Sequence, residues 1–344
     1  MLIKELSNLP GVSGDENKIR DFIREQLNKM DIKHFTDPMG NLYGVKKGQK
    51  NSGKEHQILL SAHMDEVGLM VASVEKSGLL RFYTVGGINE WSLVSKPVIV
   101  GKDEIPGVIG AKAIHLQKPD ERKKSLQVDQ LYIDIGAKNK EDAQQFVCKG
   151  DYVTFNTKAE SMADDRLISG KALDNRAGCA ALLELLQREY PHGFTAVFTV
   201  QEEVGLRGAR VAAYRVNPEV ALVLETTTAS DIPEIKKKDH ATTIGKGPAF
   251  TIRDGSVVAH PRVLECLIET AEKQNRPYQF RQYTGGFTDA GMISQSRTGV
   301  KAGVISTPCR YIHTPASLLS KGDWEHLVEI ADGFVRSVYE KGLE

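Results

Sequence analysis

Short uninterrupted apolar runs alternate along most of the chain with segments whose apolar residues recur at helical spacing. The strands that we predict from the runs lie at 41–45, 57–62, 194–200, 220–224, 278–281 and 301–305. The helices that we predict from the spacing lie at 175–189, 208–214, 262–274, 289–294 and 321–339. This alternation predicts an α/β domain whose sheet is covered on both faces.

Between residues 68 and 165 the pattern changes to short β-rich segments, separated by turns that contain Gly and Pro. Such a texture predicts a small barrel or sandwich. A lone helix is expected within it at 140–147. Because helix–strand alternation stops before this stretch and resumes after it, we predict one domain made of 1–67 and 168–344. The β-rich domain at 68–167 would be inserted into it.

The charge balance disfavours several kinds of partner. Lys and Arg number 45 and Asp and Glu also 45, so no net charge attracts nucleic acid or an anionic membrane surface. No apolar run approaches the roughly 20 residues that span a bilayer, and residues 1–6 lack a signal-peptide core. The four cysteines form no Cys-x-x-Cys pair, so the sequence indicates neither a disulfide framework nor a zinc–thiolate site. We expect a cytoplasmic protein with no nucleic-acid or membrane partner.

Polar side chains stand where the predicted strands and one helix meet their loops. They are His63, Asp65, Glu202, Glu203, Glu225 and His313 after apolar runs, and Asp174 before the helix at 175–189. In an open α/β sheet ligands gather beyond the carboxyl ends of the strands, so these groups should converge. Burying two adjacent carboxylates costs free energy unless a cation offsets their charge. Imidazoles and carboxylates without thiolates suit zinc, cobalt or manganese, and two ions sharing a carboxylate would use the whole set.

Four motifs resemble, in order and spacing, the M42 family of metalloaminopeptidases, the glutamyl and tetrahedral aminopeptidase group. They are His63-x-Asp65, Ala172-x-Asp174-Asn-Arg-x-Gly178, Gln201-Glu-Glu-Val-Gly205 and Arg310-Tyr-Ile-His313. The resemblance implies a mixed sheet sandwiched by helices with an inserted small β-barrel domain. It implies a peptidase with two divalent metal ions per subunit, acting on peptide substrates. It also implies a dimer formed through the inserted domain and often a tetrahedral dodecamer.

The resemblance further assigns a role to each candidate residue. The implied ligands are His63 and Glu225 for one ion, Glu203 and His313 for the other, and Asp174 as the bridge. Glu202 would be the general base, Asp65 would orient His63, and a cis peptide would join Asp174 to Asn175. Two positions depart from the family pattern, because Glu225 replaces the usual Asp and Ser317 stands where many members have Glu.

The residues themselves suggest how these roles divide. Adjacent residues of a strand point to opposite sides, so Glu202 and Glu203 would not both bind one ion. Asp65 lies two residues beyond His63, on the same side of an extended chain, where it could accept the second imidazole N–H. The segment 285–291 resembles the family's glycine-rich substrate loop, although alone it favours a plain turn. Elsewhere we interpret histidines as structural, at His56, His115, His192, His240, His260 and His326.

Other functions stay open at this point. A deacylase or amidohydrolase acting on small N-acyl substrates would use the same chemistry, and dependence on a free substrate amine separates it from an aminopeptidase. A glycosidase is disfavoured, because its facing carboxyls lie at least about 5 Å apart across a sugar, unlike adjacent strand residues. A metal-stabilised assembly protein without turnover has no use for a spare carboxylate such as Glu202.

Overall fold

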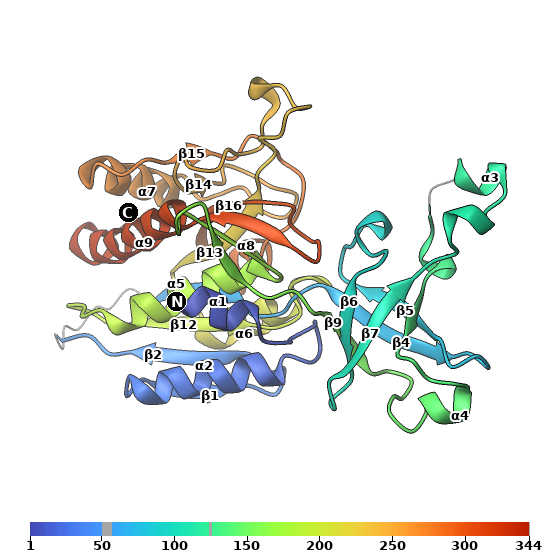
Figure 1. The fold of residues 1–344 in the computed structure, drawn as a ribbon. Helices are drawn as coiled ribbons and strands as arrows, with labels where there is room; N and C mark the ends of the chain where they lie inside the picture. Colours follow the sequence, from blue (N-terminus) through green and yellow to red (C-terminus); the bar gives the residue numbers. More distant parts are fainter. Residues whose placement is uncertain (50–56, 124–125, 344) are drawn as a thin grey trace.

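The structure is a computed structural model and describes residues 1–49, 57–123 and 126–343. Within these residues the chain forms an 11-stranded sheet, flanked by helices, and a separate closed barrel (Figure 1). The predicted fold class, an α/β mixed sheet sandwiched by helices with an inserted small β-barrel, is confirmed.

The large sheet has a parallel centre and antiparallel edges. Its strands in spatial order are β1 (Lys33–Thr36), β2 (Leu42–Lys46), β12 (Phe194–Thr199), β3 (Ile58–His63), β13 (Val220–Thr228), β16 (Lys301–Arg310), β17 (Ser317–Ser320), β11 (Leu167–Gly170) and β10 (Glu160–Met162). Two short strands, β14 (Ala249–Phe250) and β15 (Gln279–Phe280), lie off this path. The parallel centre is β12, β3, β13 and β16. Its carboxyl ends therefore meet at one edge of the sheet.

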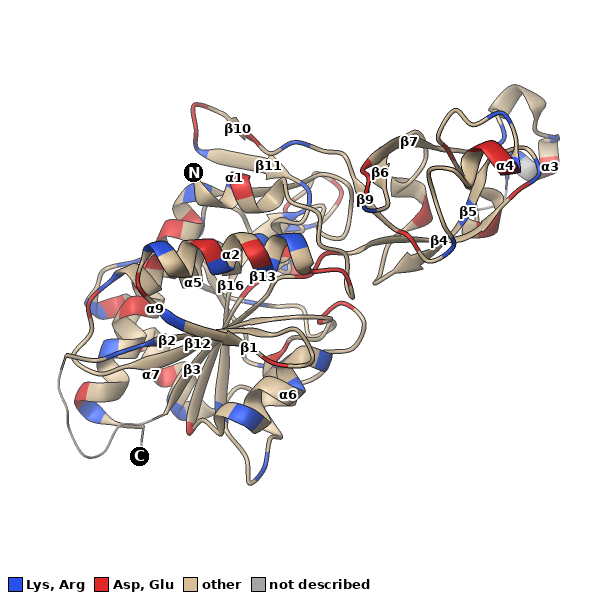
Figure 2. Cartoon of the chain, turned by 90° about the horizontal axis from the view of Figure 1, so that it is seen from below, with Lys and Arg blue, Asp and Glu red and all other residues tan. Residues whose placement is uncertain are grey.

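Helices cover both faces of this sheet. On one face lie α1 (Leu2–Ser7), α2 (Asn17–Lys29), α5 (Leu173–Gln187), α7 (Pro261–Lys273) and α9 (Lys321–Lys341), which share one hydrophobic core. The other face carries α6 (Arg207–Val216) and α8 (Ala290–Ser294). In β3, Ile58 and Leu60 join the first core and Leu59 the second, which explains its uninterrupted apolar run. Acidic and basic residues intermingle on the outer helices (Figure 2).

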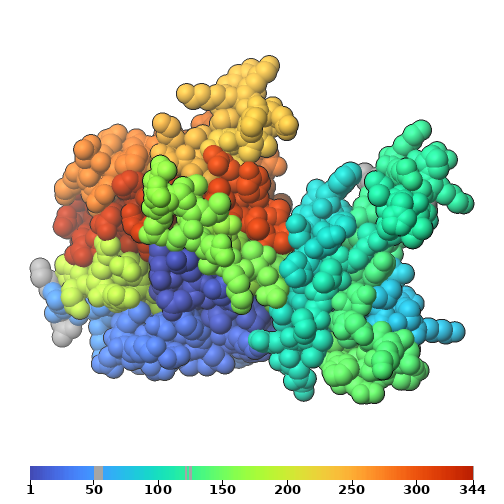
Figure 3. All heavy atoms as spheres, in the orientation of Figure 1, coloured from blue at the N-terminus to red at the C-terminus, as the bar shows by residue number. Residues whose placement is uncertain are grey.

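The barrel stands beside this body (Figure 3). It has a hydrophobic core of its own. Around it run β4 (Gly68–Val74), β5 (Leu80–Val85), β8 (Tyr132–Asp134), β7 (Ile105–Gly110), β6 (Pro97–Val100) and β9 (Tyr152–Phe155). Two single-turn helices, α3 (Pro119–Arg122) and α4 (Lys140–Ala143), lie in its connections. After β9 the chain returns to the large sheet at β10. The predicted domain limits at 67/68 and 167/168 stay a prediction.

The structure differs from the predicted elements mainly where segments are short. The helix expected at 140–147 is only the single turn α4, capped by the Asn139 side chain. The strand predicted at 301–305 continues to Arg310 as β16. Short strands such as β1, β10 and β17 have too few residues to show a period, and pairing defines them. No helix among the described residues is long and apolar enough to cross a membrane.

Candidate active site

A cavity of about 650 Å³ opens at the carboxyl edge of the parallel strands. Six of the seven predicted site residues line it, namely His63, Asp174, Glu202, Glu203, Glu225 and His313. The seventh, Asp65, is fully buried behind His63. The barrel contributes Gly87, whose carbonyl oxygen lies 3.0 Å from Nδ1 of His313. Loops from both parts of the chain therefore build the site.

The fold brings these side chains together from different elements. His63 is the last residue of β3, and Glu225 lies in β13, which pairs with β3 in parallel. Asp174 lies in the first turn of α5, where its backbone is extended and a cis peptide joins it to Asn175. Asn175 donates its side-chain amide to the Leu224 carbonyl at 2.9 Å, which ties this turn to β13.

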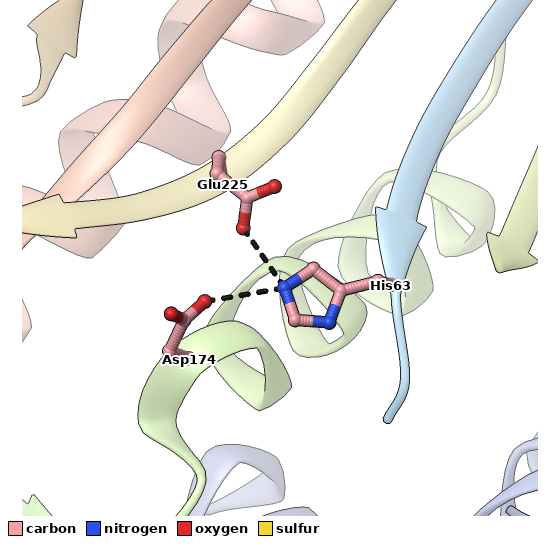
Figure 4. Close-up of side chains that lie close together, drawn as sticks. All are labelled: His63, Asp174 and Glu225. Carbon is pink, nitrogen blue, oxygen red and sulfur yellow. Dashed lines mark hydrogen bonds and ion pairs between the residues drawn. The ribbon is translucent and has the colours of Figure 1, made fainter. Parts of the chain in front are cut away.

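One imidazole faces two carboxylates. His63 Nε2 lies 3.2 Å from Asp174 Oδ1 and 3.4 Å from Glu225 Oε1 (Figure 4). Glu225, whose side chain is longer than the aspartate of the family pattern, thus reaches the imidazole of His63 from β13. Glu202 Oε2 lies further away, at 4.0 Å from the same nitrogen.

The second imidazole repeats this arrangement on the other side of Asp174. His313 Nε2 lies 3.3 Å from Asp174 Oδ2 and 3.3 Å from Glu203 Oε2. Each carboxylate oxygen of Asp174 therefore faces a different imidazole. Such a carboxylate is placed between two possible ion positions.

Asp65 connects His63 to the turn that bears the two glutamates. Its carboxylate accepts hydrogen bonds from the backbone N–H of Glu202 at 3.0 Å and of Glu203 at 3.2 Å. It also accepts the Ser13 hydroxyl at 2.6 Å. The same carboxylate lies 3.5 Å from Nδ1 of His63, and the Asp65 carbonyl lies 3.2 Å from that nitrogen. Two acceptors thus face Nδ1, which leaves Nε2 to face the cavity.

Burial raises the pKa values of the three glutamates of the site. Burial raises the pKa of Glu203 to about 8 and that of Glu225 to about 7. It also raises the pKa of Glu202 well above its ordinary value, against the opposing charge of His63. Buried carboxylates in this state need protons or a cation to balance them.

Nearby charges set the pKa values of the two histidines, which are raised, and of the aspartate between them, which is lowered. For His313 burial lowers the pKa, but Asp174 and Glu203 outweigh it and raise the value to about 9. For His63 the charges of Glu225 and Glu202 likewise outweigh burial and raise the pKa. The pKa of Asp174 is lowered, because hydrogen bonds to both imidazoles outweigh its burial. A concentrated negative field thus acts on both imidazoles.

The donor atoms fit a metal centre. Potential ligand atoms within 4.8 Å of one another form the groups His63, Asp174 and Glu225; Asp174, Glu203 and His313; and His63, Glu202 and Glu203. Two buried carboxylate oxygens, Glu203 Oε1 and Glu225 Oε2, have no hydrogen-bond partner among the described residues. Unpaired buried oxygens of this kind suit a cation as the missing partner. The nitrogen and oxygen donors match zinc, cobalt or manganese.

One prediction about the two adjacent glutamates is wrong. Glu202 and Glu203 do not lie in a strand, because β12 ends at Thr199 and the two acids occupy the turn that follows. Alternation along a strand therefore cannot separate their roles. Their ligand atoms approach His63 together. The turn, held by Asp65, decides where each carboxylate points.

Sequence reasoning missed several residues of the site. Glu16 accepts the backbone N–H of Gln201, which precedes the two glutamates, at 3.2 Å. Arg281 lines the cavity, although the sequence placed it only at the end of a strand. Neither has a local signal, since each approaches from a distant segment. The glycine-rich loop gave a signal, and its Gly286 and Thr288 do line the cavity.

The histidines interpreted as structural do not belong to this site where the structure describes them. His115, His192, His240, His260 and His326 are absent from the described lining of the cavity. His56 lies outside the described residues. Ser317, which departs from the family pattern, is buried and donates its hydroxyl to the Gly170 carbonyl at 2.9 Å. It thus joins β17 to β11.

Comparisons with known proteins identify the family to which the chain belongs. The profile of the M42 glutamyl aminopeptidase family matches residues 40–330. A putative aminopeptidase of Acetivibrio thermocellus is 37% identical over 331 residues, covering 96% of each chain. The structure of an aminopeptidase from the archaeon Desulfurococcus kamchatkensis has a TM-score of 0.92 at 37% identity, covering 98% of this chain and 94% of that one.

A third similar protein is known as an assembly. The TET1 peptidase of Pyrococcus horikoshii, described as assembling into a tetrahedron or a large octahedral shell, has a TM-score of 0.84 at 30% identity. The alignment covers 96% of this chain and 97% of that one. With the family profile matched across most of the chain, the protein belongs to the M42 glutamyl aminopeptidase family and is a peptide hydrolase.

Proposed function

We propose that the protein is a dinuclear-metal aminopeptidase, which removes N-terminal residues from peptides with Glu202 as the general base. The observation that carries this proposal is the position of Asp174, whose two oxygens face His63 and His313 at 3.2 and 3.3 Å. Each imidazole has one further carboxylate of its own, Glu225 or Glu203. Two three-residue sets that share one carboxylate suit a pair of ions better than one.

In this proposal each set would hold one ion. His63, Glu225 and Asp174 would hold the first, and Asp174, Glu203 and His313 the second. When bound, two divalent cations lower the pKa of a water molecule and polarise the carbonyl of the scissile bond. Zinc fits best, and cobalt or manganese suit the same donors.

Glu202 supplies the proton transfers. Its carboxylate lines the cavity and lies further from His63 Nε2 than Asp174 or Glu225 does, which leaves it outside both proposed sets. As general base it takes a proton from the attacking water, and it then returns that proton to the leaving amine. Burial raises its pKa, which favours a group that holds a proton between these two steps.

Asp65 acts through its neighbours rather than on the substrate. Its hydrogen bonds to the Glu202 and Glu203 N–H groups fix the turn that carries the base. Its position beside Nδ1 of His63 fixes the orientation of that imidazole. Asp65 is therefore a positioning residue, shared between the proposed ligand and the base.

The alternative is a metal-dependent deacylase or amidohydrolase on small N-acyl substrates. The same carboxylates and imidazoles would serve that reaction, so the active site alone does not separate the two. Membership in a family of aminopeptidases favours the free-amine substrate. A free amine could also serve as a ligand in the cavity, which would restrict cleavage to the N-terminal bond.

We also propose that the chain forms a homo-oligomer, a dimer through the inserted barrel that builds a tetrahedral dodecamer. The similar TET1 peptidase, which is known as a tetrahedron or an octahedral shell, supports this proposal. Native mass spectrometry would show twelve times the mass of the 37.9 kDa chain. The cytoplasm remains our expected location.

The proposed activity is tested with aminoacyl-p-nitroanilides and their N-acetylated counterparts. Chelated protein should be inactive on both sets, and zinc, cobalt or manganese should restore cleavage of the free-amine set alone. Cleavage of the N-acetylated set would instead establish a deacylase or an endopeptidase. A metal-loaded protein that cleaves neither set would contradict the proposed function.

A further inference from the structure

Two buried cations lie on either side of Asp174 in the sequence, and the proposed reaction uses neither. Lys171 precedes Asp174 by three residues and Arg176 follows it by two. Only 2% of Lys171 and 0% of Arg176 are exposed. Because a charged side chain is rarely buried so completely without partners, the groups that these two contact show what they hold in place.

Both cations converge on one carboxylate, that of Glu66. Lys171 Nζ donates to both oxygens of Glu66, at 2.8 and 2.7 Å. Arg176 Nη2 lies 3.7 Å from Oε1 of the same carboxylate. Lys171 also donates to the Leu9 carbonyl at 2.8 Å, and Nη1 of Arg176 donates to that carbonyl at 3.1 Å. The two side chains thus share their acceptors and hold the segment 171–176 from both ends.

The carboxylate of Glu66 is itself fixed by other segments of the chain. Its Oε1 accepts the backbone N–H of Gly11 at 2.9 Å and the hydroxyl of Thr154, in strand β9 of the barrel, at 3.0 Å. The backbone N–H of Glu66 donates to the Gly11 carbonyl at 2.9 Å. A Cβ at Gly11 would lie 2.6 Å from Nη2 of Arg176, so the main chain packs directly against the guanidinium. Glu66 is therefore a firm anchor for the two cations.

Glu66 directly follows Asp65, which lies beside Nδ1 of His63. One side chain of this pair thus contacts the imidazole, and the other holds the segment that carries Asp174. His63 Nε2 and Asp174 Oδ1 lie 3.2 Å apart. Because adjacent residues anchor both groups, a shift of the Glu66 contacts changes the position of Asp174 relative to His63.

The segment around Asp174 needs such anchors, because its backbone is irregular. Ala172 has a φ of 52°, in the left-handed region, and Asp174 and Asn175 have non-helical φ and ψ angles. A backbone of this kind lacks the repeated hydrogen bonds that hold a helix. Asn175 ties the segment to β13, and the two cations tie it to Glu66.

We infer that Glu66 is a positioning residue, which fixes Asp174 relative to His63 by holding Lys171 and Arg176. This inference rests on the proposed function, in which Asp174 is shared by two ions, and adds the residue that sets the geometry of the shared carboxylate. Glu66 does not line the described cavity, so it acts through the segment that carries Asp174 and not on the substrate. The alternative is a buried ion cluster that serves stability alone, and the test separates the two roles.

Replacing Glu66 by Gln removes the charge and keeps the size of the side chain. The Gln oxygen still accepts from Gly11 and Thr154, but its NH₂ faces the ammonium of Lys171. The affinity for zinc, measured by competition with a chromophoric chelator, should fall roughly 10- to 100-fold, as for other residues that orient a metal ligand.

Asp332→Asn is the matched control, because Asp332 is also a buried carboxylate between two cations. It accepts Nε of Arg336 at 2.9 Å and lies 3.7 Å from Nη1 of Arg188. It belongs to α9 and does not line the described cavity. This variant should lose stability in urea and bind zinc as tightly as the wild type. An equal loss of zinc affinity in Asp332→Asn and Glu66→Gln would overturn the inference.

Electron paramagnetic resonance of the manganese-loaded protein gives a readout that a loss of stability alone does not move. Two manganese ions that share the Asp174 carboxylate are exchange-coupled, so the wild type and Asp332→Asn should both give the coupled signal. In Glu66→Gln, part of the manganese should give the signal of isolated ions. A fully coupled signal in Glu66→Gln, together with wild-type zinc affinity, would show that Glu66 serves stability alone.

Lys171→Met keeps the inference testable if Glu66→Gln does not fold. It leaves Glu66 and Arg176 as one anion beside one cation, whereas Glu66→Gln leaves two cations without the Glu66 charge. Because Lys171→Met removes one of the two anchors, zinc affinity should fall here too, by less than in Glu66→Gln. Wild-type zinc affinity in Lys171→Met would overturn the inference.

The proposed function can fail without the inference. If the metal-loaded wild type cleaves no aminoacyl-p-nitroanilide, the aminopeptidase is refuted. The zinc affinities and the manganese spectra of the same variants still decide whether Glu66 positions Asp174.

Discussion

The carboxylate of Asp65 accepts the backbone N–H of Glu202 at 3.0 Å, so a residue two positions beyond the end of β3 fixes the main chain that carries the proposed base. Asp65 is fully buried, and its pKa lies below the ordinary value, because hydrogen bonds and the charge of His63 outweigh burial. An ionised carboxylate accepts from several donors at once. Asp65 therefore couples the position of the His63 imidazole to the position of the proposed base, Glu202.

Replacing Asp65 by Asn should loosen both the His63 imidazole and the turn that carries Glu202. The single amide oxygen of Asn accepts on one side only, and its NH₂ would face an N–H or hydroxyl donor on the other. We expect metal affinity to fall roughly 10- to 100-fold, as for other residues that orient a ligand. Competition with a chromophoric chelator measures this. Ser13→Ala removes one of the hydrogen bonds and keeps the charge, so an equally large effect there would contradict the assigned role of Asp65.

Replacing Glu202 by Gln should separate metal binding from turnover. The side chain keeps its size but cannot take a proton from water, so kcat should fall at least about 100-fold. The metal content, measured by plasma mass spectrometry, should stay that of the wild type. Glu265→Gln, at an exposed position on α7, serves as the control. Near-normal activity of Glu202→Gln would show that another group is the base.

Asp174 and His313 should differ in the number of ions that their loss releases. Asp174 belongs to both proposed sets and His313 to one. Asp174→Asn should therefore release both ions after mild chelation, while His313→Ala should release one and keep the other. Metal counts per chain, taken on matched samples, decide this. Equal counts in the two variants would rule out Asp174 as a shared ligand.

Glu16 should make stability depend on pH. Burial raises the pKa of Glu16 from 4.5 to about 7. Since the folded state binds its proton more tightly than the unfolded state, Glu16 contributes stability below pH 4.5. That contribution is lost as the pH rises through 7. Glu16→Gln should therefore become more stable than the wild type between pH 5 and pH 8, by up to about 3 kcal/mol.

Urea unfolding with chelator present throughout measures this difference. The Glu16 oxygen that accepts from Gly14 and Gln201 has a counterpart in the Gln side chain, so hydrogen bonding is preserved. Asp21→Asn, at an exposed position on α2, is the control. A difference between Glu16→Gln and the wild type that does not change with pH would contradict the buried carboxyl as its source.

The sequence predicted the fold well where elements are long and their patterns are complete. Strand β3 and helix α9 each bury many apolar side chains, so their patterns can be recognised in the sequence alone. Short strands such as β1 and β17 are defined by their partners, so four residues alone did not predict them. The single turn α4 lacks the length that a periodic pattern needs.

The candidate site was predictable where chemistry stands out against an apolar background. His63 and Glu225 each come directly after an apolar run, where a polar residue stands out in the sequence. The conformation of the Glu202 turn was not predictable, because Asp65 and Glu16 define it from distant segments. Arg281 gave no signal for the same reason, since only the folded chain brings it to the cavity.

The most direct test of the two-ion site is anomalous diffraction from crystals of the zinc-loaded protein, recorded on both sides of the zinc edge. We predict two peaks per chain, one between His63 and Glu225 and one between His313 and Glu203, with the Asp174 carboxylate between them. A single peak, or peaks outside these residues, would contradict the two-ion site.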